Sequence, residues 1–256
     1  MIRFSFVKPV LIFAGALCAV SLAPPVHADT PAVVDSGSYR VYRQDRPFGT
    51  ESFAFELRGD SLVISSQVTQ LYPAESGQDT LHKQMVMVVR AADYDLLAYD
   101  SNQMFRGLNL RRGLSAGDTT LVSVLQVDQR GEGTAVVRPP GRIYVLDPQL
   151  FVLYDVICRN LHGQTFDERT IVFYALGVPD TVFQATAADL GTETIRWGAR
   201  PVQARKLRIS DAETQFYVWI SPRGQMLRLE QPAYGLRVER EAAPVRPPAR
   251  RRPRAG

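Results

Sequence analysis

Residues that could carry out catalysis are few in this chain, and they are not grouped at a spacing typical of an active site. His82 and His162 have no Cys, His, Asp or Glu at the spacing of a zinc site, which would need three or four such ligands. The acidic pair Asp167-Glu168 precedes a strand-like run, and we interpret it as part of a solvated loop. The sequence therefore predicts no catalytic residue, no metal site and no cofactor, and we do not expect an enzyme.

Apolar residues at strand and helix spacing favour ligand binding instead. Met85 and Met87 fall on one face of a strand-like run, and Phe151 and Tyr154 belong to the segment with the clearest helical pattern. Methionine adapts its shape to variable apolar ligands. We therefore predict that these side chains bind an apolar or lipidated ligand. The alternative is that they fill the core against the helix, as in a structural or interaction module without a ligand.

The elements that would position such a site are mainly strands. From Ser38 onward, short strand-like runs alternate with turns, and Phe53 to Leu57 alternates apolar and polar side chains as a half-buried strand does. Turns such as Ser221 to Gly224 join neighbouring runs into hairpins, and consecutive hairpins form an antiparallel meander. Roughly a dozen strands are too many for a flat sheet. We predict an all-β fold, a curved antiparallel β meander or open half-barrel wrapped around one main helix.

The main helix is predicted from its caps and its apolar period. Asp147 is a favourable N-cap residue, and Pro148 suits the first helical position because its missing N–H costs nothing there. Gly163 is typical of the residue that follows a helix. Apolar residues recur between these signals at helical spacing: Leu150, Leu153, Val156, Ile157 and Leu161. The sequence predicts a helix near 148–161, with the concave side of the sheet covering its apolar face.

The first 28 residues have the pattern of an export signal. Two basic residues precede an apolar run from Val10 to Leu22, and small or tolerated residues at Val26 to Ala28 suit a signal peptidase. Two alternatives stay open, a lipoprotein signal with lipid on Cys18 and an uncleaved anchor. We predict a signal peptide over 1–28 and a periplasmic or secreted location. Cys158 is then the unpaired cysteine of the exported chain, and we interpret it as a small buried apolar residue.

Basic charge is concentrated at the C-terminus. The formal net charge is +4, although the chain between the predicted signal and the tail holds more Asp and Glu than Lys and Arg. We predict a flexible lead-in over 29–37, a single antiparallel β domain over 38–241 and a disordered Pro/Arg-rich tail over 242–256. The tail would contact an anionic envelope surface. A tail without a role is the alternative, and export argues against a nucleic-acid partner. The cations concerned are Arg250, Arg251, Arg252 and Arg254.

A late aromatic hairpin and the layout of the chain resemble a group of exported proteins. The hairpin runs from Phe216 through Ser221-Pro222-Arg223-Gly224 to Leu229, and an early Gly turn lies at Phe48 to Glu51. Together they are similar to uncharacterised bacterial exported proteins that resemble the periplasmic lipoprotein carriers, the LolA/LolB-like family. The resemblance implies a curved antiparallel sheet around helices that holds an acyl chain or a lipidated segment in its concavity. The carriers have more helices over the open face than this sequence predicts.

Overall fold

The structure, a computed structural model, describes residues 31–75 and 77–242. These residues form a sheet of 15 strands, one α-helix and one short 3-10 helix. Within this part of the chain, no helix is long and apolar enough to cross a membrane. The predicted signal peptide, 1–28, lies outside the described residues. So do the tail arginines Arg250, Arg251, Arg252 and Arg254.

The strands follow one another closely along the chain. The first eight are β1 (Ala32–Arg43), β2 (Arg46–Arg58), β3 (Ser61–Ala74), β4 (Gly77–Arg90), β5 (Leu96–Phe105), β6 (Leu108–Ala116), β7 (Thr120–Val127) and β8 (Arg130–Val137). After these come β9 (Ile143–Leu146), α1 (Val152–Leu161), β10 (Glu168–Ala175), β11 (Thr181–Trp197), β12 (Arg200–Ser210), β13 (Gln215–Ile220), β14 (Met226–Gln231), the 3-10 helix η1 (Pro232–Tyr234) and β15 (Leu236–Arg240).

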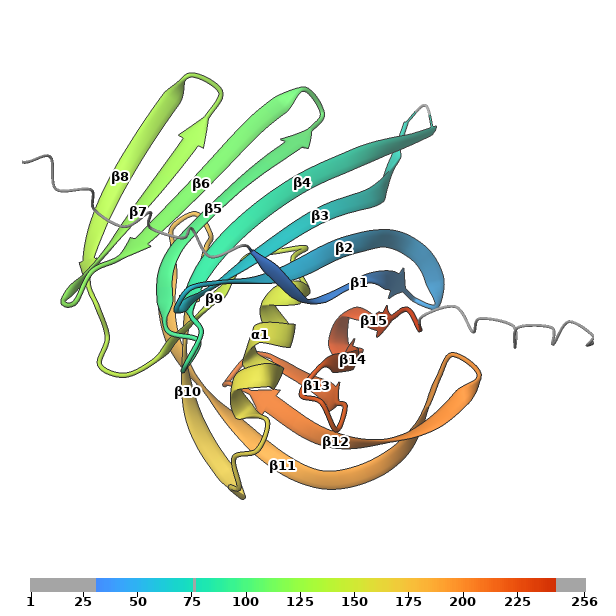
Figure 1. Ribbon diagram of the computed structural model, residues 1–256. Helices are drawn as coiled ribbons and strands as arrows, with labels where there is room; N and C mark the ends of the chain where they lie inside the picture. Colours follow the sequence, from blue (N-terminus) through green and yellow to red (C-terminus); the bar gives the residue numbers. More distant parts are fainter. Residues whose placement is uncertain (1–30, 76, 243–256) are drawn as a thin grey trace, which may run out of the picture.

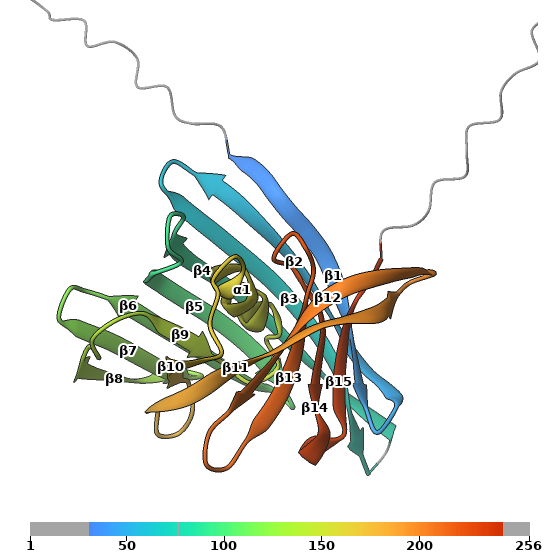
Figure 2. The same ribbon diagram turned by 90° about the horizontal axis from the view of Figure 1, so that it is seen from below.

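The first and last strands meet in the middle of the sheet (Figure 1). The order across the sheet is β8-β7-β6-β5-β4-β3-β2-β1-β15-β14-β13-β12-β11-β10-β9, so the edges are two strands from the middle of the chain. All neighbouring pairs are antiparallel except β9 and β10, which are parallel. The sheet curves strongly but does not close (Figures 1 and 2). The predicted all-β fold with a curved antiparallel meander and one main helix is confirmed.

Helix α1 lies on the concave side of the sheet because it forms the crossover between the parallel strands β9 and β10. Parallel neighbours cannot be connected by a hairpin and need a crossover segment, usually a helix. Figures 1 and 2 show α1 between the half of the sheet that holds β1–β8 and the half that holds β9–β15. All residues of the helix except Tyr154 and Arg159 are buried. The helix therefore supplies the centre of the hydrophobic core.

Side chains join the two ends of the curved sheet. Asp180, in the loop before β11, accepts hydrogen bonds from Arg112 Nη1 on β6 at 3.1 Å and from Ser123 Oγ on β7 at 2.5 Å. The Tyr174 hydroxyl on β10 donates to the same carboxylate at 3.1 Å. Polar contacts thus hold β6 and β7 against the β10–β11 connection, where backbone pairing is not available.

The helix begins later than the sequence predicts. Its first residue is Val152, because the chain from 148 to 151 forms turns, and no side chain of its own N-cap residue bonds to the helix. Asp147, the predicted cap, is instead buried and paired with Lys83 of β4, so its carboxylate is not available to the helix. The predicted stop is confirmed, since Gly163 follows the helix with φ of 75°.

Residues 32–37 of the predicted lead-in, 29–37, belong to a strand. β1 begins at Ala32, which lies opposite Leu57 of β2. The pairing continues past a register shift between Val33 and Asp35. The long partner strand supplies the hydrogen bonds that make this segment a strand, and its own small and polar residues give little sign of it.

Candidate functional site

Two adjoining cavities open at one end of the concave side. Their volumes are about 590 and about 550 Å³. Four residues line both: Leu146 at the end of β9, Tyr154 of α1, Ala175 at the end of β10 and Gln231 at the end of β14. Because they share this wall, we treat the cavities as one cleft and call the larger cavity lobe A and the smaller one lobe B.

Lobe A lies between α1 and the inner face of β10 to β13. Its apolar wall consists of Phe173, Phe183, Ala185, Ile209 and Phe216, in addition to the shared residues. Polar groups come from the loop between β12 and β13, where Asp211 accepts hydrogen bonds from the backbone N–H groups of Glu213 and Thr214, both at 2.7 Å. Lobe A is therefore an aromatic and aliphatic hollow with an acidic loop at its rim.

Lobe B lies between the segment that leads into α1 and the ends of β1, β2 and β3. Its apolar wall consists of Phe48, Tyr72, Pro148, Phe151, Leu176 and Leu236. Arg43, Gln70, Gln149 and Tyr234 add polar groups. Phe48 and Tyr72 meet edge to face with ring centroids 5.0 Å apart. Such aromatic pairs give lobe B a rigid wall on the β2–β3 side.

Tyr154 forms the ridge between the two lobes. Its ring packs edge to face on Phe216, with centroids 5.0 Å apart and planes at 83°. Burial raises the pKa of the Tyr154 phenol to about 12, so the hydroxyl stays neutral at physiological pH. A neutral phenol offers a ligand both an apolar ring and a hydrogen-bonding tip.

Glu51 of β2 fixes the start of the helix beside lobe B. Its Oε2 accepts the backbone N–H of Phe151 at 2.7 Å and that of Val152 at 3.2 Å, and Ser66 Oγ donates to Oε1 at 2.6 Å. A carboxylate at this place complements the helix dipole. Burial raises the pKa of Glu51 to about 7, and these hydrogen bonds lower it in part. The cap thus comes from a strand far away in the sequence.

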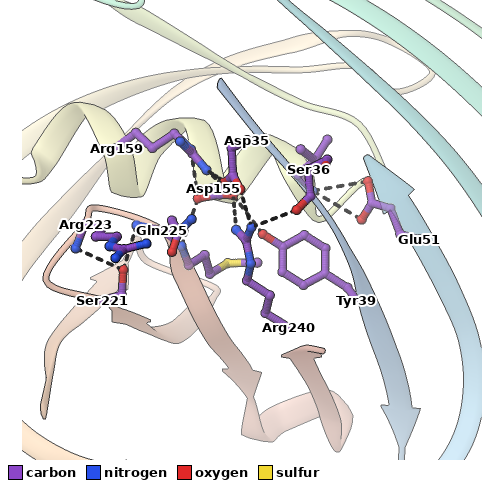
Figure 3. A network of polar contacts seen from close by, with 12 residues as sticks. Asp35, Ser36, Tyr39, Glu51, Asp155, Arg159, Ser221, Arg223, Gln225 and Arg240 are labelled. Atoms are coloured by element: carbon purple, nitrogen blue, oxygen red, sulfur yellow. Dashed lines mark hydrogen bonds and ion pairs between the residues drawn. The ribbon is translucent and has the colours of Figure 1, made fainter. Parts of the chain in front are cut away.

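A second buried carboxylate ties the middle of the helix to both halves of the sheet (Figure 3). Asp155 accepts hydrogen bonds from the Tyr39 hydroxyl of β1 at 3.0 Å and from the Met226 backbone N–H of β14 at 2.8 Å. Arg159 and Arg240 lie 3.3 and 3.4 Å from its oxygens. Burial, followed by the nearby Asp155 charge, raises the pKa of Tyr39 well above its ordinary value. The network holds the helix where β1 meets β15.

A third buried group connects β4 and β5 with the segment before the helix. Lys83 pairs with Asp147, and its ammonium also donates to the Pro148 carbonyl at 3.0 Å. The Tyr99 hydroxyl and Ser101 Oγ donate to the same carboxylate. Burial lowers the pKa of Lys83, and the Asp147 charge opposes that change. These contacts fix the turn at 148–151 that forms part of lobe B.

The structure brings together only two of the four predicted ligand-binding residues. Phe151 lines lobe B and Tyr154 lines both lobes. Met85 and Met87 lie on the inner face of β4, with 2% and 3% of their surface exposed, and belong to the hydrophobic core. They line neither lobe. Their place agrees with the core-filling alternative, whereas Tyr154 and Phe151 line the cleft, although Phe151 is also a buried core residue.

Several residues of the cleft have no signal in the sequence. Leu146, Ala175 and Gln231 lie at the ends of three strands and meet only because the sheet curves around the helix. Arg43 and Phe48 flank the first hairpin turn, and nothing in their spacing indicates a site. The aromatic residues of β10 and β11 would be the best sequence signal, because Phe173 and Phe183 lie opposite each other in the pairing of these strands.

The chain also contains a Gly-x-Ser-x-Gly segment, Gly113 to Gly117, a pattern that holds the nucleophilic serine in α/β hydrolases. Ser115 lies inside β6, opposite Ala98 and Val122, and its side chain is exposed. The pattern needs a sharp turn from a strand into a helix. In this chain Ser115 is followed by the end of β6, a short loop and strand β7, and no helix begins there. The segment therefore does not form a nucleophile elbow.

The remaining candidates for chemistry lie apart from the cleft. Cys158 is fully buried in α1, and burial raises the pKa of its thiol well above the ordinary value, which keeps it a packing residue. His162 follows the helix, but Arg205 rather than the His162 side chain bonds to the terminal Leu161 carbonyl, at 3.1 Å. Within residues 31–75 and 77–242, no three His, Cys, Asp or Glu side chains are grouped as metal ligands would be.

Comparisons with known proteins identify no function for this chain. No protein-family model and no curated protein matches the sequence. A crystal structure of a DUF1089 family protein from Pseudomonas aeruginosa is similar with a TM-score of 0.43 and 11% sequence identity, over 72% of this chain and 90% of that chain. At this level of similarity, the function must be inferred from the cleft itself.

Proposed function

We propose that this chain is a non-enzymatic, exported envelope protein that binds an apolar or lipidated ligand in the cleft at the open end of its sheet. The observation that carries the proposal is the pair of adjoining lobes of about 590 and about 550 Å³ around Tyr154. Volumes of this order, with a mostly apolar lining and a few polar groups, are typical of small-molecule sites.

The shape of the cleft favours an elongated ligand. The two lobes share Leu146, Tyr154 and Ala175 in one wall, so a flexible chain can pass along this wall from one lobe to the other. Each buried methylene group contributes about 0.8 kcal/mol. A ligand with several methylene groups in the lobes would therefore bind by apolar burial alone, as an acyl chain or the lipid of a lipidated partner would.

The alternative, a module without a ligand, is supported by the filling of the rest of the concavity. Helix α1 is almost entirely buried, and three buried carboxylates, Glu51, Asp147 and Asp155, hold it or the preceding turn in place. In that case the cleft would be the unfilled mouth of a self-contained core. Binding measurements distinguish the two functions.

The test of the proposed function is a change that fills the cleft. Ala175 lines both lobes and is partly exposed, so Ala175→Trp would place an indole between them. We expect this variant to bind a fluorescent fatty acid at least tenfold more weakly than the unaltered protein does. Ala98→Trp, on the exposed face of β5, is the matched control and should bind as the unaltered protein does.

Native mass spectrometry gives a second readout. The unaltered protein should carry the added mass of a ligand retained from the cell, and the Ala175→Trp variant should not. Circular dichroism would verify that both variants fold. Equal affinity of the two tryptophan variants for the fatty acid would contradict binding in the cleft. Absence of binding by the unaltered protein would favour the structural module.

The predicted location and tail belong to the same proposal. Export through residues 1–28 would place the cleft among envelope lipids, and the tail arginines would bring it to an anionic surface, each contributing about 1 kcal/mol near such a surface. Deleting residues 247–256 should therefore abolish salt-sensitive association with anionic vesicles. Equal association of full-length and truncated protein at low salt would contradict this part of the proposal. The cations concerned are Arg250, Arg251, Arg252 and Arg254.

A further inference from the structure

The rim of lobe B carries a cation at a position where the inner face of β1 would otherwise be apolar. Tyr39, Val41 and Arg43 alternate along this face, and the first two are fully buried core residues. Arg43 is the last residue of the strand, and its side chain is exposed where the cleft opens. Its guanidinium carbon lies 4.4 Å from the centroid of the Phe48 ring, a wall residue of lobe B. The charge is thus held against the cleft.

Among the described residues, Arg43 has no ion pair or side-chain hydrogen bond. Two other cations nearby do have partners, because Arg40 pairs with Glu241 at 2.5 Å and Arg237 pairs with Asp45 at 3.2 Å. The residue opposite Arg43 across the β1–β2 hairpin is Arg46, a second cation. Like charges directly opposite each other on a sheet are destabilising. An anion at this position would offset that repulsion.

The other charge in lobe B is already neutralised. Asp147 is 5% exposed and binds Lys83, Tyr99 and Ser101, so it does not oppose an anion at the rim. Lobe A has the opposite character, since its rim carries Asp211 and Glu213. The cleft therefore has a cationic end and an acidic end, and a charged ligand would be oriented by this difference.

We infer that the ligand is an anionic amphiphile, with its charged headgroup bound by Arg43 at the mouth of lobe B and its apolar chain passing Tyr154 into the lobes. This inference rests on the proposed function and specifies the ligand class. The planar guanidinium matches a carboxylate or a phosphate with two parallel hydrogen bonds. The headgroup stays partly in water while the chain is buried, as the exposure of Arg43 requires.

The experiment compares two probes that differ in one charge, a dansyl-labelled undecanoic acid and its methyl ester. We expect the unaltered protein to bind the acid at least tenfold more tightly than the ester at low salt, and the difference to shrink as salt is added. Arg43→Gln should weaken binding of the acid to the level of the ester and leave the ester unchanged. Arg130→Gln, on the exposed edge strand β8, removes the same charge away from the cleft and should change neither affinity.

Three results would overturn the inference, and they differ in what they say of the proposed function. Equal binding of acid and ester, or equal weakening of both by Arg43→Gln, would reject the headgroup site and leave apolar binding in place. Binding of neither probe would reject the proposed function together with the inference. Arg43→Lys adds a further readout, because a single ammonium cannot make the paired hydrogen bonds and should restore the preference for the acid only in part.

Discussion

Glu51 connects the sheet to the helix and makes the stability of the fold depend on pH. It is fully buried in β2, where it accepts the first two N–H groups at the start of the helix, and its pKa lies near 7 because burial disfavours the charge. Three other ionisable groups lie near Glu51. The charge of Asp155 raises the pKa of Glu51, and the charge of Glu51 raises the pKa values of Lys83 and Tyr39. In the unfolded chain its pKa would be the ordinary value of 4.5.

We predict that the Glu51 contribution to stability falls as pH rises. Between pH 4.5 and about 7 the folded protein keeps a proton on Glu51 that the unfolded chain releases. The contribution is fully present below pH 4.5 and is lost as pH rises through about 7. A shift of this size corresponds to about 3 kcal/mol. Glu51→Gln keeps an acceptor for the helix and should remove this part of the pH dependence of the free energy of unfolding, measured with urea from pH 4 to pH 8.

Glu56→Gln is the matched control, because Glu56 lies on the same strand and pairs with Arg58 at its surface. This variant should keep the slope of the unaltered protein. If the Glu51 and Glu56 variants had the same pH dependence, Glu51 would not be the titrating group.

Gly49 lies where the neighbouring strand leaves no space for a Cβ atom. A Cβ at this position would lie 2.5 Å from the Thr69 carbonyl oxygen and 2.6 Å from Gln70 Cγ, so the neighbouring strand leaves no room for a side chain. Gly49→Ala should lower the free energy of unfolding by about 1–3 kcal/mol. In Gly113→Ala the new carbon would lie 3.9 Å from its nearest neighbour, and the urea midpoint should fall little or not at all. Equal losses in the two variants would show that strand propensity, not the close approach, sets the effect.

At the scale of elements, α1 depends on contacts from many parts of the chain. Its start is capped by Glu51 of β2, its middle is bound through Asp155 to β1 and β14, and its last carbonyl accepts from Arg205 of β12. A helix of ten residues is too short to be stable alone in water. Its position therefore follows from the sheet, and its exact start could not be read from Asp147 and Pro148.

The buried pair Lys83–Asp147 tests this dependence. Lys83→Met would leave the Asp147 carboxylate buried with only Tyr99 and Ser101 as partners, and loss of one member of a buried pair costs about 3–5 kcal/mol. We expect the double variant Lys83→Met with Asp147→Leu to recover part of this loss, since no charge is then buried. Urea unfolding of the single and double variants gives the coupling free energy. Additive effects of the two changes would contradict a buried ion pair.

The sequence predicted elements well where the pattern is local. The strand Gln215–Ile220 ends directly before the predicted turn at Ser221 to Gly224, because the turn residues define this boundary. Prediction from the sequence fails for strands whose extent depends on their pairing with other strands. β11 is one strand of 17 residues, and its continuation through the register shift between Asp189 and Thr192 follows from its pairing with β12. The four-residue β9 is a short apolar run without alternation, which fits a buried helix as well as a strand, so its parallel pairing with β10 decides the structure.

At the scale of the whole molecule, the curved meander was predictable but the cleft was not. Consecutive hairpins and the number of strands are enough to predict a curved sheet around a helix. The pairing of β1 with β15 and the crossover through α1 determine which strand ends meet, and both are contacts between distant parts of the chain. Leu146, Ala175 and Gln231 become neighbours only through that arrangement, which explains why prediction found Tyr154 and Phe151 but not the rest of the cleft.

The same topology predicts an unusual pattern of local stability. Strands near chain ends usually fray, but β1 and β15 lie in the centre of the sheet with partners on both sides. β8 is an edge strand in the middle of the chain, and all its residues except Val136 are exposed. Backbone amides of β1 at 39–43 and of β15 should therefore exchange with deuterium roughly ten or more times more slowly than those of β8, since opening the centre requires more of the sheet to separate. Hydrogen exchange followed by mass spectrometry measures all these segments in one experiment, and β15 peptides that exchange as fast as β8 peptides would contradict the central pairing.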